Sequence, residues 1–239
     1  FTRTSFQDRN DIYKREVVPL AQTAIEKALE KASWNAQELD YIITVSCTGI
    51  MIPSIDAYLI NSMGMRQDIV RLPVTEMGCV AGISGLIYAE NFLRANPNKK
   101  AAVLAVEAAH EMYHFPDATH MMGFDLVNSG LQMVLDKSVP ETIASHFPAI
   151  IHPFLEKNGL TINDIDHLIF HPGGKKIVQT VEELFHKLGK NIDDTKEVLR
   201  IYGNMSSATV LFVLERFMSR ELNKGSKGLM LSFGPGFTA

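Results

Sequence analysis

Two stretches of the 239-residue chain decide its fold: WNAQELDYIITVS at residues 34–46 and LTINDIDHLIFHP at residues 160–172. Each passes from a polar segment into a short run of apolar, often β-branched residues. Such runs are typical of strands that are buried in a parallel sheet. We therefore predict strands over Tyr41–Val45 and His167–Phe170, at equivalent places in two copies of one unit.

Two landmarks indicate that this unit is duplicated. Asp40 matches Asp166, 126 positions later, and Gly78-Cys79 matches Gly203-Asn204, 125 positions later. Nearly equal offsets are what two copies of an α/β unit would produce, although any α/β chain repeats strand and helix patterns to some extent. The sequence therefore predicts two related halves.

Helices and strands alternate through the rest of the chain. Pro19 is tolerated only in the opening turns of a helix, so the first helix is expected to begin near Val18. The predicted helices cover residues 18–32, 80–95, 141–158, 175–188 and 206–222, and further strands cover 70–72, 101–106, 198–201 and 228–233. This alternation favours α/β organisation with a largely parallel sheet.

The composition excludes several classes of protein. Hydrophobic residues make up 46% and charged residues 21% of the chain, which is typical of a globular protein and not of a disordered one. A net charge of −4 argues against a nucleic-acid binder. No apolar run is long enough to cross a membrane, and no secretory signal is visible. Two cysteines cannot form a disulfide scaffold, so we expect a cytoplasmic protein.

A pseudo-twofold axis between the halves would bring equivalent strand ends together. Cys47 would then lie near His171, and Cys79 near Asn204. Active sites of α/β sheets lie outside the carboxyl ends of the strands, so chemistry is expected here. Cys79 stands at the start of a predicted helix, where the helix dipole favours a thiolate nucleophile. The alternative is a buried cysteine with a structural role.

His171 and Asn204 are the candidate partners of this cysteine. Histidine is the usual base or donor beside a cysteine nucleophile, and HPGG would fix its ring at a strand end. Asn204, expected at a strand–helix junction, offers an uncharged N–H donor that suits an oxyanion, although asparagine is equally common as a helix cap. Such a set serves either amide hydrolysis or thioester chemistry.

Four motifs resolve this choice by resemblance. They are GCVAG (78–82), HPGG (171–174), YGNMSSA (202–208) and SFGPGFT (232–238), in this order. Together they resemble the type III polyketide synthases, also called the chalcone and stilbene synthase family. The resemblance implies a thiolase-like α/β fold of two duplicated halves in layered αβαβα order. We place the halves at residues 1–107, with Cys79, and 108–239, with His171 and Asn204.

The resemblance also implies the chemistry. Cys79 would carry the acyl chain, while His171 and Asn204 would support decarboxylation of malonyl-CoA and attack of the resulting carbanion. The implied substrates are an acyl-CoA starter and malonyl-CoA, without a further cofactor. The implied assembly is a homodimer that binds neither nucleic acid nor membrane. Two rival readings are a ketoacyl-synthase III-like enzyme that makes one condensation, and an inactive thiolase-fold protein kept for assembly.

The family's pocket positions fall on a second set of residues. By resemblance, Cys47 belongs to the pocket wall, Met133 takes a gatekeeper position that is usually aromatic, and Ile52 reaches into the neighbouring subunit's cavity. Gly234-Pro235-Gly236 would shape the cavity floor. Plain core packing explains each of these residues about as well. Met133 and Cys47 together favour an aliphatic starter.

Two features depart from the family pattern. Glu107-Ala108-Ala109 runs directly into a segment that resembles a much later part of the family, so we expect residues to be missing near 107–109. The basic residues that hold the coenzyme A phosphates in the family lie largely before the family equivalent of Phe1, so we expect them to be absent from this sequence.

The segment His110–His114 also matches HExxH, a zinc-peptidase motif, but Pro116 would cut its helix short.

Overall fold

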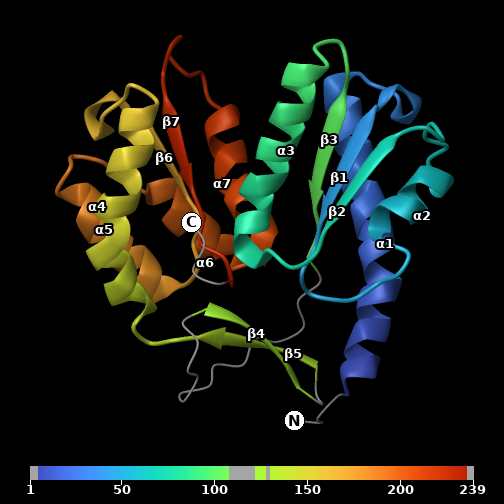
Figure 1. The fold of residues 1–239 in the computed structure, drawn as a ribbon, viewed down its shortest axis with the longest axis horizontal. Helices are drawn as coiled ribbons and strands as arrows, with labels where there is room; N and C mark the ends of the chain where they lie inside the picture. Colours follow the sequence, from blue (N-terminus) through green and yellow to red (C-terminus); the bar gives the residue numbers. More distant parts are fainter. Residues whose placement is uncertain (1–4, 108–121, 128–129, 236–239) are drawn as a thin grey trace.

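The computed structural model describes residues 5–107, 122–127 and 130–235, and the side chains of 5–107 and 135–235. Helices and sheets alternate in layers (Figure 1). Helices α1 and α2 cover one sheet, α3 and α7 form the central layer, and α4 and α5 cover the second sheet. This is the αβαβα arrangement expected from the sequence, so that prediction is confirmed.

The first half is built on a parallel sheet in the order β2-β1-β3. Tyr41 of the central strand aligns with Val70 on one side and Ala101 on the other. Its elements are α1 (Phe6–Ala32), η1 (Ala36–Glu38), β1 (Tyr41–Val45), α2 (Ile55–Ser62), β2 (Val70–Val74), η2 (Gly78–Val80), α3 (Ala81–Ala95) and β3 (Ala101–Ala105).

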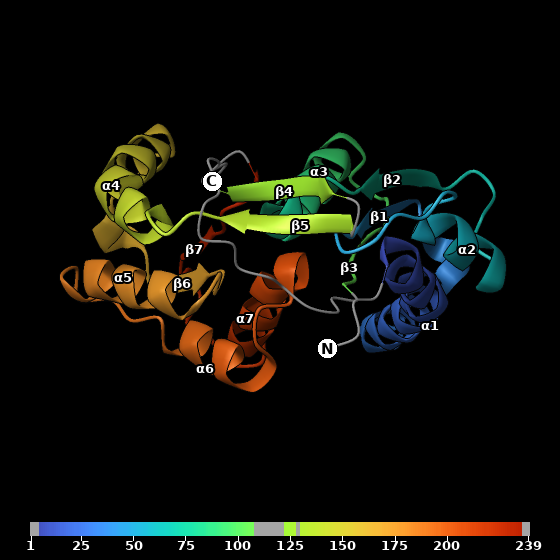
Figure 2. The ribbon, with the colours of Figure 1, turned by 90° about the horizontal axis from the view of Figure 1, so that it is seen from below.

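The second half has a parallel pair, β6 and β7, in which His167 aligns with Gly228. An antiparallel pair, β4 with β5, precedes it and lies across one end of the layers, from the side of α4 to the side of α1 (Figures 1 and 2). The elements are β4 (Met122–Val127), β5 (Gly130–Leu135), α4 (Val139–Lys157), η3 (Ile162–Asp164), β6 (His167–Phe170), α5 (Lys175–His186), α6 (Asp193–Tyr202), η4 (Ser206–Ala208), α7 (Thr209–Met218) and β7 (Gly228–Leu231).

Four apolar clusters fill the four interfaces between layers. Val17, Ala21 and Ile25 of α1 pack on one face of the first sheet, and Ala81 and Ala89 of α3 pack on its other face. In the second half the corresponding clusters join β6 to α7 and β6 to α4 and α5. Since burying one Val or Ile side chain contributes about 1.5–3 kcal/mol, these interfaces hold the layers together.

The duplication extends to single hydrogen bonds. Asp40 donates its backbone N–H to the Lys100 carbonyl (2.9 Å), and the Asp40 carboxylate accepts the Lys100 N–H (2.9 Å). Asp166 makes the same pair of bonds with Lys227, each 2.8 Å long. In both halves this turn fixes where the first strand begins beside its last neighbour. The two halves are therefore copies in detail. The proposed boundary after Glu107 remains a prediction.

The first helix begins earlier than predicted. Helix α1 starts at Phe6 and continues through Pro19, because Ser5 and Asp8 cap its first turn reciprocally. Its buried side chains recur every four residues from Tyr13 to Leu29, so packing maintains the helix across the proline. Tertiary contacts here override a local preference against proline.

The strand predicted over Val198–Ile201 is wrong. These residues belong to helix α6, which has two aspartates in its first turn and buries Thr195 and Val198 at helical spacing. A four-residue apolar run cannot by itself distinguish a strand from a helix. Asn204 consequently follows a helix and not a strand. Helix α2 and the β4–β5 pair were also not predicted.

Candidate active site

Cys79 lies in η2, directly before the central helix α3. Gly78 precedes it with φ of +54°, a conformation that favours glycine and turns the chain from β2 into the helix. The Cys79 carbonyl accepts a hydrogen bond from Ser232 Oγ (2.9 Å), and its sulfur lies 3.5 Å from Ser206 Oγ. The cysteine therefore sits at the helix start, as predicted, between residues of the second half.

The thiol is held in its neutral form. Burial raises the pKa of Cys79, and the hydrogen bond with Ser206 opposes this rise only in part. The nearby carboxylate of Glu107 raises the pKa further. Our expectation that the helix dipole would favour a thiolate is thus outweighed by burial. The sulfur has to lose its proton to a base before it can attack a substrate.

His171 follows β6 and is buried, with 3% of its surface exposed. Its backbone N–H donates to the Leu231 carbonyl (2.8 Å), which places the ring at the carboxyl end of the strand. Neither ring nitrogen has a hydrogen-bond partner among the described residues. Burial lowers the pKa of His171 to about 4, so the imidazole is neutral at physiological pH. A buried ring of this kind can accept one proton and donate another to a bound reactant.

The carboxamide of Asn204 is fixed from both ends. Its nitrogen donates to the Gly173 carbonyl (3.0 Å), and its oxygen accepts the Ser206 N–H (2.9 Å). A carboxamide nitrogen carries two N–H groups, and this bond uses one of them. Asn204 therefore has the donor chemistry that the sequence predicted, although the element before it is a helix.

A chain of contacts joins the three candidate residues. Ser206 touches the Cys79 sulfur through its hydroxyl and Asn204 through its N–H. Asn204 in turn bonds to Gly173, whose Cα position lies beside the His171 ring, since a Cβ built there would be 3.8 Å from its Cδ2. The structure thus brings together Cys79 of η2, His171 directly after β6, and Asn204 shortly before η4.

The predicted pocket positions differ in how close they lie to these three residues. Cys47 is buried, and its sulfur lies 3.1 Å from Ser206 Oγ, next to the candidate site. Gly234 packs against the η2 turn, because a Cβ there would lie 2.7 Å from the Met77 carbonyl oxygen. Pro235 follows it. Ile52 is 92% exposed.

Several predictions fall at the edge of the described residues. Met133 lies on β5, where its Cα is opposite that of Phe124. Gly236, Ala108, Ala109 and the whole His110–His114 motif lie outside the described residues. Among those described, no group of three or more His, Cys, Asp or Glu side chains could hold a metal ion.

Three contacting residues, Ser206, Ser207 and Glu107, were not singled out as site residues from the sequence. Ser206 adopts φ of +52°, a left-handed conformation that costs a non-glycine residue about 1–3 kcal/mol. Its hydroxyl lies near both cysteine sulfurs. Glu107 follows β3 and bonds to the segment that contains Cys47. The second serine of YGNMSSA, Ser207, reaches the same carboxyl group. The repeated hydroxyls of this motif could have pointed to the two serines, whereas no motif surrounds Glu107.

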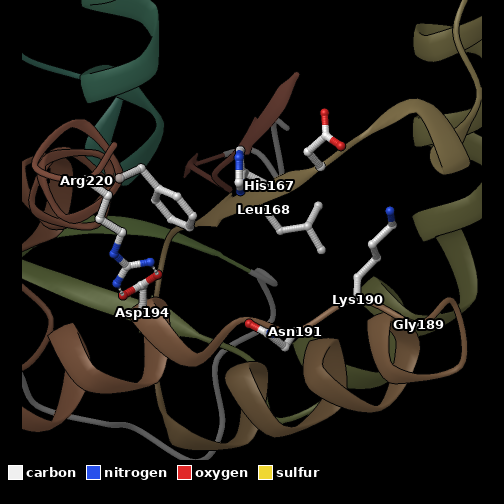
Figure 3. A pocket seen from close by; sticks show the side chains of 9 residues that line it. His167, Leu168, Gly189, Lys190, Asn191, Asp194 and Arg220 are labelled. Carbon is white, nitrogen blue, oxygen red and sulfur yellow. Dashed lines mark hydrogen bonds and ion pairs between the residues drawn. The ribbon is translucent and has the colours of Figure 1, made fainter. Parts of the chain in front are cut away.

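A cavity of about 310 Å³ opens at the other end of β6 (Figure 3). Several of its charged side chains have partners: Asp194 binds Arg216 and Arg220, and Lys190 Nζ donates to the Ile165 carbonyl (2.5 Å). Because this cavity lies at the amino end of the strand, it is separate from the candidate site.

The fold and this cysteine at the start of the central helix define a thiolase-fold condensing enzyme. Residues 1–136 match the family described as chalcone and stilbene synthases, N-terminal domain, and residues 106–239 match the corresponding C-terminal domain. The chain therefore belongs to the chalcone and stilbene synthase family, the type III polyketide synthases. The resemblance seen in the motifs is confirmed.

Individual relatives agree with this assignment. A 1,3,6,8-tetrahydroxynaphthalene synthase of Streptomyces peucetius is 31% identical over 266 residues, covering 92% of this chain and 71% of the relative. A phloroglucinol synthase of Pseudomonas fluorescens is 27% identical and covers 99% and 80%. The crystal structure of 1,3,6,8-tetrahydroxynaphthalene synthase from Streptomyces coelicolor superposes with a TM-score of 0.87 at 28% identity, covering 99% and 80%.

Membership of the family fixes the reaction. The chain is a malonyl-CoA-dependent acyltransferase that condenses a coenzyme A-linked starter with malonyl-CoA through a cysteine thioester. The match over 266 residues of the first relative also exceeds the 239 residues of this chain, so that relative contains residues with no counterpart here. In residues 5–107, 122–127 and 130–235, no helix is long and apolar enough to cross a membrane.

Proposed function

We propose that Cys79 carries the growing acyl chain and that His171 and Asn204 support each condensation. The observation that carries this proposal is the His171 ring, which is buried beside Gly173 with both nitrogens unpartnered among the described residues. Gly173 in turn accepts a hydrogen bond from Asn204. A buried polar group without a partner costs about 1–3 kcal/mol, and a bound substrate would offset this cost. Ser206 connects the same region to the Cys79 sulfur.

Loading begins with proton transfer. The neutral His171 ring accepts the thiol proton of Cys79, and the sulfur attacks the carbonyl carbon of the starter thioester. A new carbon–sulfur bond forms, the bond to coenzyme A breaks, and the proton returns to the coenzyme A sulfur. The low pKa of His171 makes this ring a weak base that does not retain the proton.

Extension follows from malonyl-CoA. Loss of carbon dioxide leaves an electron pair on the α-carbon, delocalised as an enolate. His171 and Asn204 donate N–H groups to the enolate oxygen, which is the role of an oxyanion hole. The α-carbon then attacks the thioester on Cys79, so that a carbon–carbon bond forms and the sulfur leaves. The two donors are uncharged, so they stabilise the enolate without protonating it readily.

We infer that the product is a polyhydroxylated aromatic compound. Support comes from the names of the relatives, a tetrahydroxynaphthalene synthase and a phloroglucinol synthase. A pyrone is the alternative, since an α-pyrone synthesis protein of Mycobacterium tuberculosis is 27% identical. The aliphatic starter expected from Met133 and Cys47 is tested with the same assay.

We also propose that the protein is a homodimer in the cytoplasm. An exposed Ile52 supports a homodimer in which this side chain enters the neighbouring subunit. We propose that acyl-CoA and malonyl-CoA suffice for turnover, without a further cofactor. Both cysteines are free thiols, which supports the reducing cytoplasm as the compartment.

The test is incubation of the purified protein with labelled malonyl-CoA, alone and with aliphatic and aromatic starters, followed by mass spectrometry. Several extensions and an aromatic product support the proposal. A single extension would favour the ketoacyl-synthase-like reading. An unacylated Cys79 and no product would leave the inactive thiolase-fold protein, and equal use of aromatic starters would contradict the aliphatic preference.

A further inference from the structure

One carboxylate occurs at equivalent places in the two halves but has different partners. In the first half, the Asp40 carboxylate accepts hydrogen bonds from Arg66 Nη1 (2.7 Å) and Lys99 Nζ (2.8 Å). In the second half, the Asp166 carboxylate accepts the backbone N–H of Lys227 (2.8 Å). Among the described residues, no basic side chain forms an ion pair with Asp166. Its negative charge is therefore not compensated as that of Asp40 is.

Backbone hydrogen bonds show that a serine replaces the first of the two cations. Lys99 donates its N–H to the Asn96 carbonyl (3.1 Å), and Ser226 makes the same bond with the Asn223 carbonyl (3.0 Å). Both bonds lie directly before the residue whose N–H binds the carboxylate. Ser226 therefore has the place of Lys99.

An asparagine replaces the second cation. Helices α2 and α5 are each followed by a glycine with positive φ. The residue after this glycine, Met65 or Lys190, donates its N–H to a carbonyl of the preceding helical turn (3.0 and 2.9 Å). The next residue is Arg66 in the first half and Asn191 in the second. Both long cationic side chains are thus replaced by short, uncharged ones.

The cavity of about 310 Å³ lies at this place (Figure 3). Asp166, Lys190 and Asn191 line it, together with the apolar side chains of Leu168 and Phe217. The replacement of two long side chains by short ones leaves room beside the carboxylate. An aliphatic chain can contact the apolar part of the lining.

Lys190 adds an ammonium group to the same cavity. It has the place of Met65, which is buried in the first half. The Lys190 side chain extends from the turn between α5 and α6 toward the start of β6, where its Nζ donates to the Ile165 carbonyl (2.5 Å). Two of its N–H groups remain. Among the described residues no carboxylate forms an ion pair with it, so the cavity contains one negative and one positive group without an opposite charge.

We propose that this cavity binds a small zwitterion, an amino acid in which an ammonium or guanidinium group and a carboxylate are joined by an aliphatic chain. The cation of the ligand pairs with Asp166, as Arg66 and Lys99 pair with Asp40. Its carboxylate accepts the remaining N–H groups of Lys190. The site lies at the amino end of β6 and is therefore additional to the candidate active site.

Calorimetric titration of the full chain at low ionic strength tests the proposal. The ligands are a series of ω-amino acids from glycine to ε-aminocaproate. We expect saturable binding of at least one member. The amine and the carboxylic acid of the same chain length carry one charge each and should bind about fivefold more weakly, which is the contribution of one partly exposed ion pair. No saturable binding in the series, or equal binding of the amine, would overturn the proposal.

Two substitutions remove the charges of the cavity one at a time. Asp166→Asn keeps an oxygen that can accept the Lys227 N–H, and Lys190→Met introduces the residue found at the equivalent place in the first half. Each should weaken binding of the amino acid about fivefold. Only Asp166→Asn should weaken binding of the amine. Unchanged amino-acid binding in both variants would contradict the site.

Glu183→Gln and Lys187→Met are the matched controls. They remove one negative and one positive charge from exposed positions at the end of α5, outside the cavity lining. Both variants should bind the amino acid as the wild type does. A loss equal to that of Asp166→Asn would show a general effect of surface charge and would overturn the proposal.

A third variant keeps the test decisive if the first two fold poorly. Asn191→Arg introduces the guanidinium of the first half, which should pair with Asp166 and exclude the cation of the ligand. Binding should be lost while the urea midpoint does not fall. Unchanged binding would place the ligand elsewhere. None of these measurements requires malonyl-CoA or a reactive Cys79, so their outcome is independent of the proposed function.

Discussion

The imidazole of His171 is enclosed by protein, and this has a consequence for stability. Its pKa is about 4 in the folded protein against 6.5 in the unfolded chain. Between these values the unfolded chain binds a proton at His171 and the folded protein does not. The free energy of unfolding should therefore fall as the pH drops from 6.5 to 4, by roughly 3 kcal/mol, with no further loss from this group below pH 4.

Urea unfolding at pH 7 and pH 4.5 measures this effect. The variant His171→Gln, which cannot titrate there, should lose less stability over the same interval than the wild type. Equal losses in both proteins would show that His171 is not buried in its neutral form.

The roles of Cys79 and Asn204 can be separated by substitution. Cys79→Ala removes the sulfur and should abolish acylation by the starter. Asn204→Ala keeps the sulfur but removes one enolate donor, so loading should persist while decarboxylation slows about 10²–10³-fold. Intact mass measures the acyl-enzyme, and release of labelled carbon dioxide measures the second step. Equal loss of both steps in Asn204→Ala would contradict this division.

The candidate site residues could be predicted from the sequence where a motif surrounds them. The contacts between their side chains could not. Cys79, His171 and Asn204 stand in motifs, and the structure links them through Ser206 and Gly173. Glu107 has no motif in this sequence. Its carboxyl group contacts two segments, residues 46–48 and Ser207, that only the folded chain brings together. The neutral state of the thiol was missed for the same reason, because burial is a property of the fold.

At the scale of elements, the central helices meet through Gly82. A Cβ built at Gly82 would lie 2.3 Å from the carbonyl oxygen of Ser207, which is too close for any side chain. Gly82→Ala should therefore reduce the free energy of unfolding by about 1–3 kcal/mol, although alanine favours helices. Gly174→Ala is the control, since a Cβ there has nothing within 4 Å. Equal unfolding curves for the two variants would refute the close approach.

The elements differ in how well the sequence predicted them. Strands β1 and β6 have the predicted bounds, because both are apolar runs whose residues are buried along almost their whole length. The run 198–201 was assigned to a strand although α6 buries one face of it. Helix α1 extends about three turns before its predicted start, because Tyr13 and Val17 continue its buried face on the amino-terminal side of Pro19.

In the whole molecule, the two halves share the same backbone turns and hydrogen bonds at equivalent positions. The turn at Asp40 and Lys100 recurs at Asp166 and Lys227 with the same bonds. A further match appears where the halves approach each other: Gly78 and Gly203 both have positive φ. Gly78 begins η2 and Gly203 lies three residues before η4, and a helix follows each of these turns. The offset in the sequence predicted this equivalence, even though the element before Gly203 was misassigned.

Assembly is tested at the same scale. If Ile52 enters a neighbouring subunit, the protein should sediment as a dimer at micromolar concentration. Ile52→Asp would bury a charge in that contact and should shift the equilibrium toward monomer. Leu20→Asp, at an exposed site on α1, is the control. A dimer unaffected by Ile52→Asp would exclude this contact from the interface.

The approach of main chain to main chain at Gly82 also bears on engineering. Helices that approach each other without intervening side chains have little freedom to separate, so we expect the region around Cys79 to keep its dimensions from one catalytic cycle to the next. The length of the polyketide would then be set by the side chains that the growing intermediate contacts. Substitutions of the side chains that surround this intermediate should therefore change the product. Substitutions that separate Gly82 from Ser207 should instead destabilise the protein.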